Sequence, residues 1–281
     1  MTIRRALPLL LLLAAPAQAQ QLPVAELGFA GGGGWLPAYP ASDQNRWRGL
    51  AVPYFIYRGS IFRSDDQGLR ARADLADGVE LSLSASGGVN ASSNDITVRQ
   101  GMPDLDWLGE IGPTLRFTLW RGEGEGGPRR IVLDTPVRAV FSTDWSSVSF
   151  RGFTFAPDIA YEHVNFLSPF ARLRLSAGVV FGSERYTDYF YEVDPQYARP
   201  GRPAYGASPG YVGSRLSVSY RLPLSERLSV VAGGRVENFS GAANADSPLF
   251  RSEWNFSVVA GFAFSFWRSE ATVSAASQPF D

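Results

Sequence analysis

Cysteine and lysine are both absent from this 281-residue chain, and histidine occurs once, as His163. Without cysteine there are no disulfides, thiol nucleophiles or cysteine metal sites. Without lysine there are no Schiff-base lysines and no Ser–Lys dyads. The lone imidazole could serve as a base beside a serine or be an ordinary polar residue at a strand end, and we favour the second interpretation. No spacing of His, Asp and Glu indicates a metal site, so the sequence predicts neither catalysis nor a cofactor.

An excess of charge of either sign is also missing. The chain carries 26 basic residues, all arginine, and 27 acidic residues, for a formal net charge of -1. This balance gives no electrostatic reason to expect nucleic acid as a partner. Beyond the N-terminus there is no run of 18 apolar residues, which argues against membrane-spanning helices. The run GGGGW (31–35) lacks the lysine and the helix of a phosphate loop, and indicates a strand that bends or packs closely.

The N-terminus has the parts of a secretory signal peptide. Two arginines precede the short apolar run ALPLLLLLAA (6–15), and the small-x-small sequence AQA (17–19) follows it. A membrane anchor is the alternative, but the run is short for crossing a bilayer. We therefore expect residues 1–19 to be cleaved, and residues 20–281 to leave the cytoplasm as a single domain.

Most of the exported chain alternates between apolar and polar residues, as in SRLSVSYRLP (214–223). The polar face is Ser, Gly, Thr and Arg. Strands of about ten residues with aromatic ends suit an outer-membrane barrel whose apolar face meets lipid. A soluble periplasmic β protein would also alternate, but its inner face would need dense packing of large side chains. The aromatic residues expected near the strand ends are Tyr54, Tyr57, Trp120, Tyr161, Trp254 and Trp267.

The sequence therefore predicts an all-β protein, a transmembrane antiparallel up-and-down β-barrel. Region 48–76 holds either one long meander or an extra short hairpin around Asp65–Gly68, so the barrel has ten or twelve strands, and we prefer twelve. The last strand is expected to end near residue 267, leaving a short periplasmic tail from about 268. Long loops alternate with short turns, and they are expected near residues 35–47, 90–106, 142–150, 184–210 and 240–252.

Charged residues on the polar face should point into the lumen. They would form either an ion-pair network that plugs the interior, which we favour, or a narrow, anion-selective pore lined with arginine. The candidate lumen charges are Arg70, Arg72, Arg116, Arg138, Arg172, Arg174, Arg215, Arg221, Arg235, Glu80, Asp158 and Glu162.

The segment 184–210 is the most prominent long loop because it is rich in aromatic residues and arginine. Such a loop suits contact with a protein or glycan, and it equally suits a loop folded over the barrel mouth. The candidate contact residues in this loop are Tyr186, Tyr189, Tyr191, Tyr197 and Tyr205.

Several stretches of the chain are similar to a known family. They are PAYPASD (37–43), PYFIYRGSIFRSDDQGLRARADL (53–75), GMPDLDWLGEIGPTLRF (101–117), and the segment 189–251 from YFYEVDPQYARPGRPAYG to ANADSPLFR. In this order and spacing they resemble the MltA-interacting protein (MipA/OmpV) family across essentially the whole mature chain.

The resemblance implies an outer-membrane β-barrel without catalytic residues. It also implies a scaffold that joins a murein lytic transglycosylase to a murein synthase, with outer-membrane lipid around the barrel. Other members of the family are described as adhesins or as proteins of envelope stress and antibiotic response.

Overall fold

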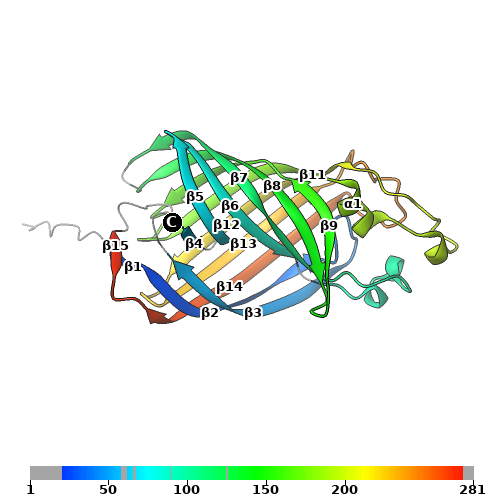
Figure 1. Ribbon diagram of the computed structural model, residues 1–281, viewed down its shortest axis with the longest axis horizontal. Helices are drawn as coiled ribbons and strands as arrows, with labels where there is room; N and C mark the ends of the chain where they lie inside the picture. The colour runs from blue at the N-terminus through cyan, green and yellow to red at the C-terminus, as the bar shows by residue number, and fades with distance from the viewer. Residues whose placement is uncertain (1–20, 58–61, 66–67, 89, 125, 275–281) are drawn as a thin grey trace, which may run out of the picture.

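The computed structural model describes residues 21–57, 62–65, 68–88, 90–124 and 126–274 (Figure 1). The expected signal peptide, residues 1–19, lies outside the described residues. No helix in the described ranges is long and apolar enough to cross a bilayer.

Fifteen strands, one α-helix and three short 3-10 helices make up the described structure. The strands before the first long loop are β1 (Gln21–Pro23), β2 (Ala25–Pro37), β3 (Asn45–Tyr57), β4 (Phe62–Asp65), β5 (Gly68–Ala76) and β6 (Val79–Gly88). The later strands are β7 (Trp107–Gly122), β8 (Arg129–Thr143), β9 (Val148–Phe155), β10 (Asp158–Val164), β11 (Arg172–Gly182), β12 (Gly210–Pro223), β13 (Leu228–Asn238), β14 (Trp254–Arg268) and β15 (Thr272–Ser274). The helices are η1 (Ser93–Asp95), η2 (Thr97–Arg99), α1 (Glu184–Tyr191) and η3 (Pro195–Tyr197).

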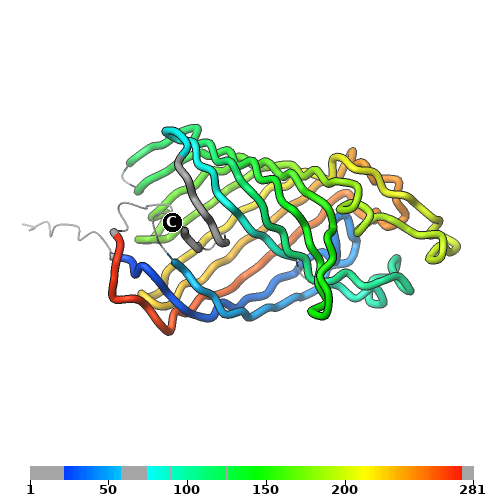
Figure 2. The backbone as a smooth tube through the Cα atoms, viewed as in Figure 1, coloured from blue at the N-terminus to red at the C-terminus, as the bar shows by residue number. Residues whose placement is uncertain are grey.

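Twelve strands follow one another around the wall of a barrel, in the order β3-β2-β14-β13-β12-β11-β10-β8-β7-β6-β5-β4 (Figures 1 and 2). Each described ladder between them is antiparallel. Strand β9 extends β10 beyond a break at Ala156 and Pro157, and both pair with β8 and β11. The predictions of an all-β antiparallel barrel and of twelve strands are confirmed.

The twelfth strand comes from the short hairpin of β4 and β5. Residue Asp65 pairs with Gly68 across its turn, and β4 is only four residues long. On its other side, β5 pairs with β6 only from Val79 to Ser82. The remainder of β6 forms a ladder with β7 alone, and β3 forms its described ladder with β2 alone. Among the described residues, no ladder joins β3 to β4 or to β6.

The outward face of the wall is apolar. Phe29 of β2 and Phe264 of β14 are ladder partners, and both rings are exposed on the outside. The other outward positions of β14 include Phe256 and Phe262, which are also exposed. A continuous band of this size would be unusual on a soluble monomer, whereas it suits contact with acyl chains.

Aromatic residues gather near both ends of this band. Trp35 and Trp47 pack at the end that carries the long loops, with ring centroids 5.9 Å apart. Of the aromatic residues expected at strand ends, four have exposed outward side chains: Tyr57, Trp120, Trp254 and Trp267. The expectation for Tyr54 was wrong. Its ring lines the interior because it is the ladder partner of the inward-facing Gly28, whose missing side chain leaves room for it.

The glycine run of β2 lies within the wall and holds two strands close together. A Cβ atom on Gly32 would lie 2.6 Å from the carbonyl oxygen of Ala260 on β14. A side chain at this position would therefore force the strands apart.

Loops of different length separate the two ends of the barrel. Segments 38–44, 90–106, 183–209 and 239–253 lie at one end with α1, whereas β1 and β15 pair beyond the other end (Figure 1). Since long loops face outward in such barrels and short turns face the periplasm, we call these the outer and the periplasmic end.

The long loop expected at 142–150 is instead a tight turn of residues 144–147. Asp144 Oδ1 accepts hydrogen bonds from the backbone N–H groups of Ser146 and Ser147, at 2.9 and 2.8 Å. These groups and the Ser146 hydroxyl lower the pKa of Asp144 to about 2. The Asp-Trp-Ser-Ser sequence is thus a self-contained turn, and β8 and β9 run up to its edges.

Candidate functional site: the lumen and its cap

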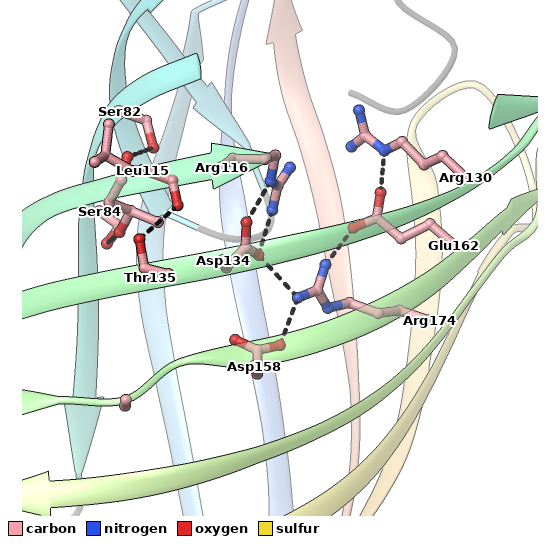
Figure 3. A network of polar contacts seen from close by, with 12 residues as sticks. Ser82, Ser84, Leu115, Arg116, Arg130, Asp134, Thr135, Asp158, Glu162 and Arg174 are labelled. Atoms are coloured by element: carbon pink, nitrogen blue, oxygen red, sulfur yellow. Dashed lines mark hydrogen bonds and ion pairs between the residues drawn. The ribbon is translucent and has the colours of Figure 1, made fainter. Parts of the chain in front are cut away.

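A network of six charged side chains lies on the inner face of the barrel, along the neighbouring strands β7, β8, β10 and β11 (Figure 3). Arg116 of β7 binds Asp134 of β8 through two hydrogen bonds, Nε to Oδ1 at 2.6 Å and Nη2 to Oδ2 at 2.8 Å. Arg174 of β11 reaches Asp134 Oδ2 at 3.1 Å and Asp158 Oδ2 at 3.0 Å. Arg174 also binds Glu162, which accepts a further hydrogen bond from Arg130. Three arginines and three carboxylates therefore neutralise one another.

The ladders explain why these side chains meet. Asp134 is the cross-strand partner of both Arg116 and Asp158, and Glu162 is the partner of both Arg130 and Arg174. Residues directly opposite each other in a sheet share a face, so all six point inward. Paired in this way, the charges avoid the cost of burying isolated ions.

An interior cavity of about 830 Å³ surrounds the network. Nine candidate lumen charges line this cavity: Arg116, Arg138, Arg172, Arg174, Arg215, Arg221, Arg235, Asp158 and Glu162. Glu80 is buried as the ladder partner of Arg116. The side chains of Arg70 and Arg72 lie outside the described residues.

Asp134 and Arg130 belong to the network but were not among the candidates. Both lie on β8, where Asp134 is four residues from the candidate Arg138 and so shares its face. The same period-two alternation that identified Arg138 would have identified them. In the segment RRIVLDTP (129–136) the alternation is hard to recognise, because the inward positions hold both charged and apolar residues.

His163 lies at the periplasmic end and is buried rather than exposed. Its Nε2 donates a hydrogen bond to the carbonyl oxygen of Gly126 at 2.9 Å, and its Nδ1 accepts one from the Tyr161 hydroxyl at 3.3 Å. Neither partner is a serine. Within the described part of the chain, no three His, Asp or Glu residues are grouped so as to hold a metal ion.

Four outer loops fold together over the barrel mouth, and we call segments 38–44, 90–106, 183–209 and 239–253 the cap. Most of their buried apolar side chains form one cluster with inward residues of the wall, and Met102, Val193 and Leu249 form a second, smaller one; Val98 packs against both. Phe190 lies at the centre of the larger cluster, with ring centroids 5.2 Å from Tyr186 and 5.1 Å from Tyr189. Burial raises the pKa of the nearby Tyr191 well above its ordinary value. The cap is therefore a small hydrophobic core, not a set of separate loops.

Buried polar side chains tie the cap loops to one another. Arg99 donates to the carbonyl oxygen of Phe190 at 3.2 Å, and Arg202 donates to those of Val98 and Gln100 at 2.8 and 3.0 Å. Asn244 bonds both backbone groups of Ser208 through its side-chain amide, each at 2.8 Å. These contacts satisfy carbonyl groups that irregular backbone leaves free, so they favour a single arrangement of the loops.

The five candidate contact tyrosines all lie in the cap. Tyr186 and Tyr191 are buried beneath it, and Tyr191 donates a hydrogen bond to the Pro40 carbonyl at 3.2 Å. Tyr189, Tyr197 and Tyr205 are half-buried. Of the two interpretations of this loop, the structure favours a loop folded over the mouth.

Three of the four stretches that suggested a family lie partly in this cap, and a comparison with family models matches them. The model described as MltA-interacting protein MipA matches residues 29–266. The chain belongs to the MipA family. Together with its apolar outer band, this makes it an outer-membrane β-barrel protein.

The chain was also compared with curated proteins and with solved structures. No curated protein matches the chain. A bacterial polysaccharide outer membrane secretin is 10% identical, with 87% of this chain and 99% of that chain covered and a TM-score of 0.40. The NanC porin is 8% identical, with 84% and 98% covered and a TM-score of 0.39. Pseudomonas putida OprB is 9% identical, with 86% and 94% covered and a TM-score of 0.34. Likenesses this distant carry no argument about function.

Proposed function

We propose that this MipA-family barrel is a non-enzymatic scaffold that holds a murein lytic transglycosylase and a murein synthase at the outer membrane. The family name, MltA-interacting protein, supports a partner of this kind. The observation that carries the proposal is a group of exposed apolar side chains on the periplasmic turns. Leu167 is 86% exposed, Leu224 is 57% exposed and Phe170 is 46% exposed.

These three residues lie where a murein enzyme would approach. Leu167 and Phe170 are in the turn between β10 and β11, and Leu224 is in the turn between β12 and β13. The first turn is held in shape, because the Tyr220 hydroxyl donates to the Phe166 carbonyl at 3.0 Å. Exposed apolar residues on an ordered turn suit the buried centre of a protein interface.

Photo-crosslinking can test this surface directly. With a photoreactive amino acid in place of Leu167 or Leu224, we expect crosslinks to both murein enzymes in intact envelopes. Burial of two leucine side chains contributes several kcal/mol, so the double variant Leu167→Ser/Leu224→Ser should lower recovery of the enzymes about tenfold or more.

The matched control is Trp145, which is exposed in an outer turn. The same photoreactive residue there should give no crosslink to either enzyme. Recovery of no murein enzyme from the periplasmic positions, or equal recovery from Trp145, would exclude the scaffold proposal.

A narrow anion channel is the second candidate. Seven arginines but only three Asp or Glu residues line the cavity, which would favour anions in a pore. The cap and the charge network argue against an open path. We therefore expect the purified protein to give no current steps in planar bilayers, and regular anion-selective steps would favour the channel instead.

A further inference from the structure

The cavity has two walls of different chemistry. The charge network occupies the side formed by β7, β8, β10 and β11. The opposite side, formed by β13, β14 and β2, presents Val231, Gly233, Val259, Ala263 and Ala30, interrupted by the small polar residues Ser229 and Ser257. We call this second side the apolar wall.

Two valines of the apolar wall are left exposed to the cavity. Val231 is 41% exposed and is the ladder partner of Arg221, so it points inward. Val259 is 43% exposed and is the partner of Gly233 and Gly34. Barrel interiors that hold only water are lined by polar residues. Exposed hydrocarbon within a cavity gains free energy from an apolar ligand, not from water.

Cations border the apolar wall. Arg235 of β13 is two residues from Gly233, on the same face, and Arg215 lies on the adjacent strand β12. Their described hydrogen bonds go to neutral oxygens: Arg215 to the Ala156 carbonyl at 3.5 Å, and Arg235 to Ser217 Oγ at 3.3 Å. Glu237 is the ladder partner of Arg215, but neither arginine is within ion-pair distance of a carboxylate among the described residues.

The apolar surface of the cavity continues onto β3. Leu50 and Val52 share the face of Tyr54, which lines the cavity, and both are exposed. The apolar surface thus extends to β3, and the cap covers the outer mouth above it.

We propose that the lumen binds a single-chain anionic amphiphile, with its hydrocarbon chain on the apolar wall and its carboxylate or phosphate group at Arg235 and Arg215. This site is independent of the periplasmic surface proposed for murein enzymes.

Binding can be measured with the full mature chain in phosphatidylcholine nanodiscs, with 11-(dansylamino)undecanoic acid as the fluorescent probe. We expect saturable binding above that of empty discs, with one site per chain. Dodecanoate and dodecyl phosphate represent the two head groups, and displacement of the probe by either supports the site. Dodecyltrimethylammonium should not displace it.

Two matched pairs of variants test the two ends of the ligand. Arg235→Gln should weaken probe binding about tenfold or more, because a hydrogen bond between two charged groups is lost, whereas Arg227→Gln in a periplasmic turn should not. Val259→Gln should weaken binding, whereas Val258→Gln, on the lipid face of the same strand, should not. Heat-dependent mobility on gels checks that each variant is folded.

The proposal is overturned if the probe binds no more than to empty discs, or if the cationic amphiphile displaces it equally well. Unchanged affinity in both lumen variants would likewise exclude the site. Loss of the murein-enzyme crosslinks would leave this result untouched, so the two proposals can fail separately.

Discussion

Replacing Asp134 with alanine is expected to lower the free energy of unfolding by about 3–5 kcal/mol, because it removes one partner from a buried ion pair. Asp134 accepts two hydrogen bonds from Arg116 and one from Arg174. Arg116 is buried and would lose its bidentate partner. Urea titration of the protein in lipid vesicles, followed by tryptophan fluorescence, measures the change.

Two further variants identify the cause of the loss. Asp77→Ala removes an exposed carboxylate from the β5–β6 turn and should change stability little. The double variant Arg116→Met/Asp134→Leu removes both charges and should be less destabilised than Asp134→Ala, because both members of the bidentate ion pair are removed together. If the double variant has a lower free energy of unfolding than Asp134→Ala, the network does not stabilise the barrel by charge pairing.

Replacing Phe190 with alanine is expected to lower the free energy of opening of the cap by about 3–5 kcal/mol, which is the usual cost of removing a buried ring. Phe190 is in contact with three tyrosine rings and has no ladder with the wall. The loss should therefore be local. Amide hydrogen exchange should become at least about 100-fold faster at Val193 and Tyr205, whose backbone groups pair with each other within the cap.

The ladder amides of β13 and β14 are the internal control for this experiment, and they should keep their protection. Trp145→Ala removes an exposed ring of similar size at the same end and should leave the cap unchanged. Equal loss of protection in cap and wall would mean that the cap is not a separate cooperative unit.

Alternation along the chain was enough to assign most side chains to a face. The arginines at 116, 174, 215 and 235 all line the cavity, because period two depends only on the geometry of a single strand. The assignment failed for Tyr54, because it was placed on the lipid face as an aromatic residue near a strand end and not from its position in the alternation.

Turns were predicted less well than strands. The loop expected at 142–150 is a four-residue turn because Asp144 supplies the hydrogen bonds that close it. Gly, Ser and Asp content indicates irregular backbone but does not give its length. For the hairpin at Asp65–Gly68, the sequence offered two alternatives and the ladders decided between them.

By itself, the sequence determined that the chain forms amphipathic strands, which face of each strand is apolar, and which family the chain belongs to. These properties depend on neighbouring residues or on the order of short motifs. Only the tertiary structure decided that Arg174 meets carboxylates from two other strands, that four loops form one cap core, and that an apolar wall faces the charged one. Each of these depends on pairing between segments far apart in the chain, which local periodicity does not encode.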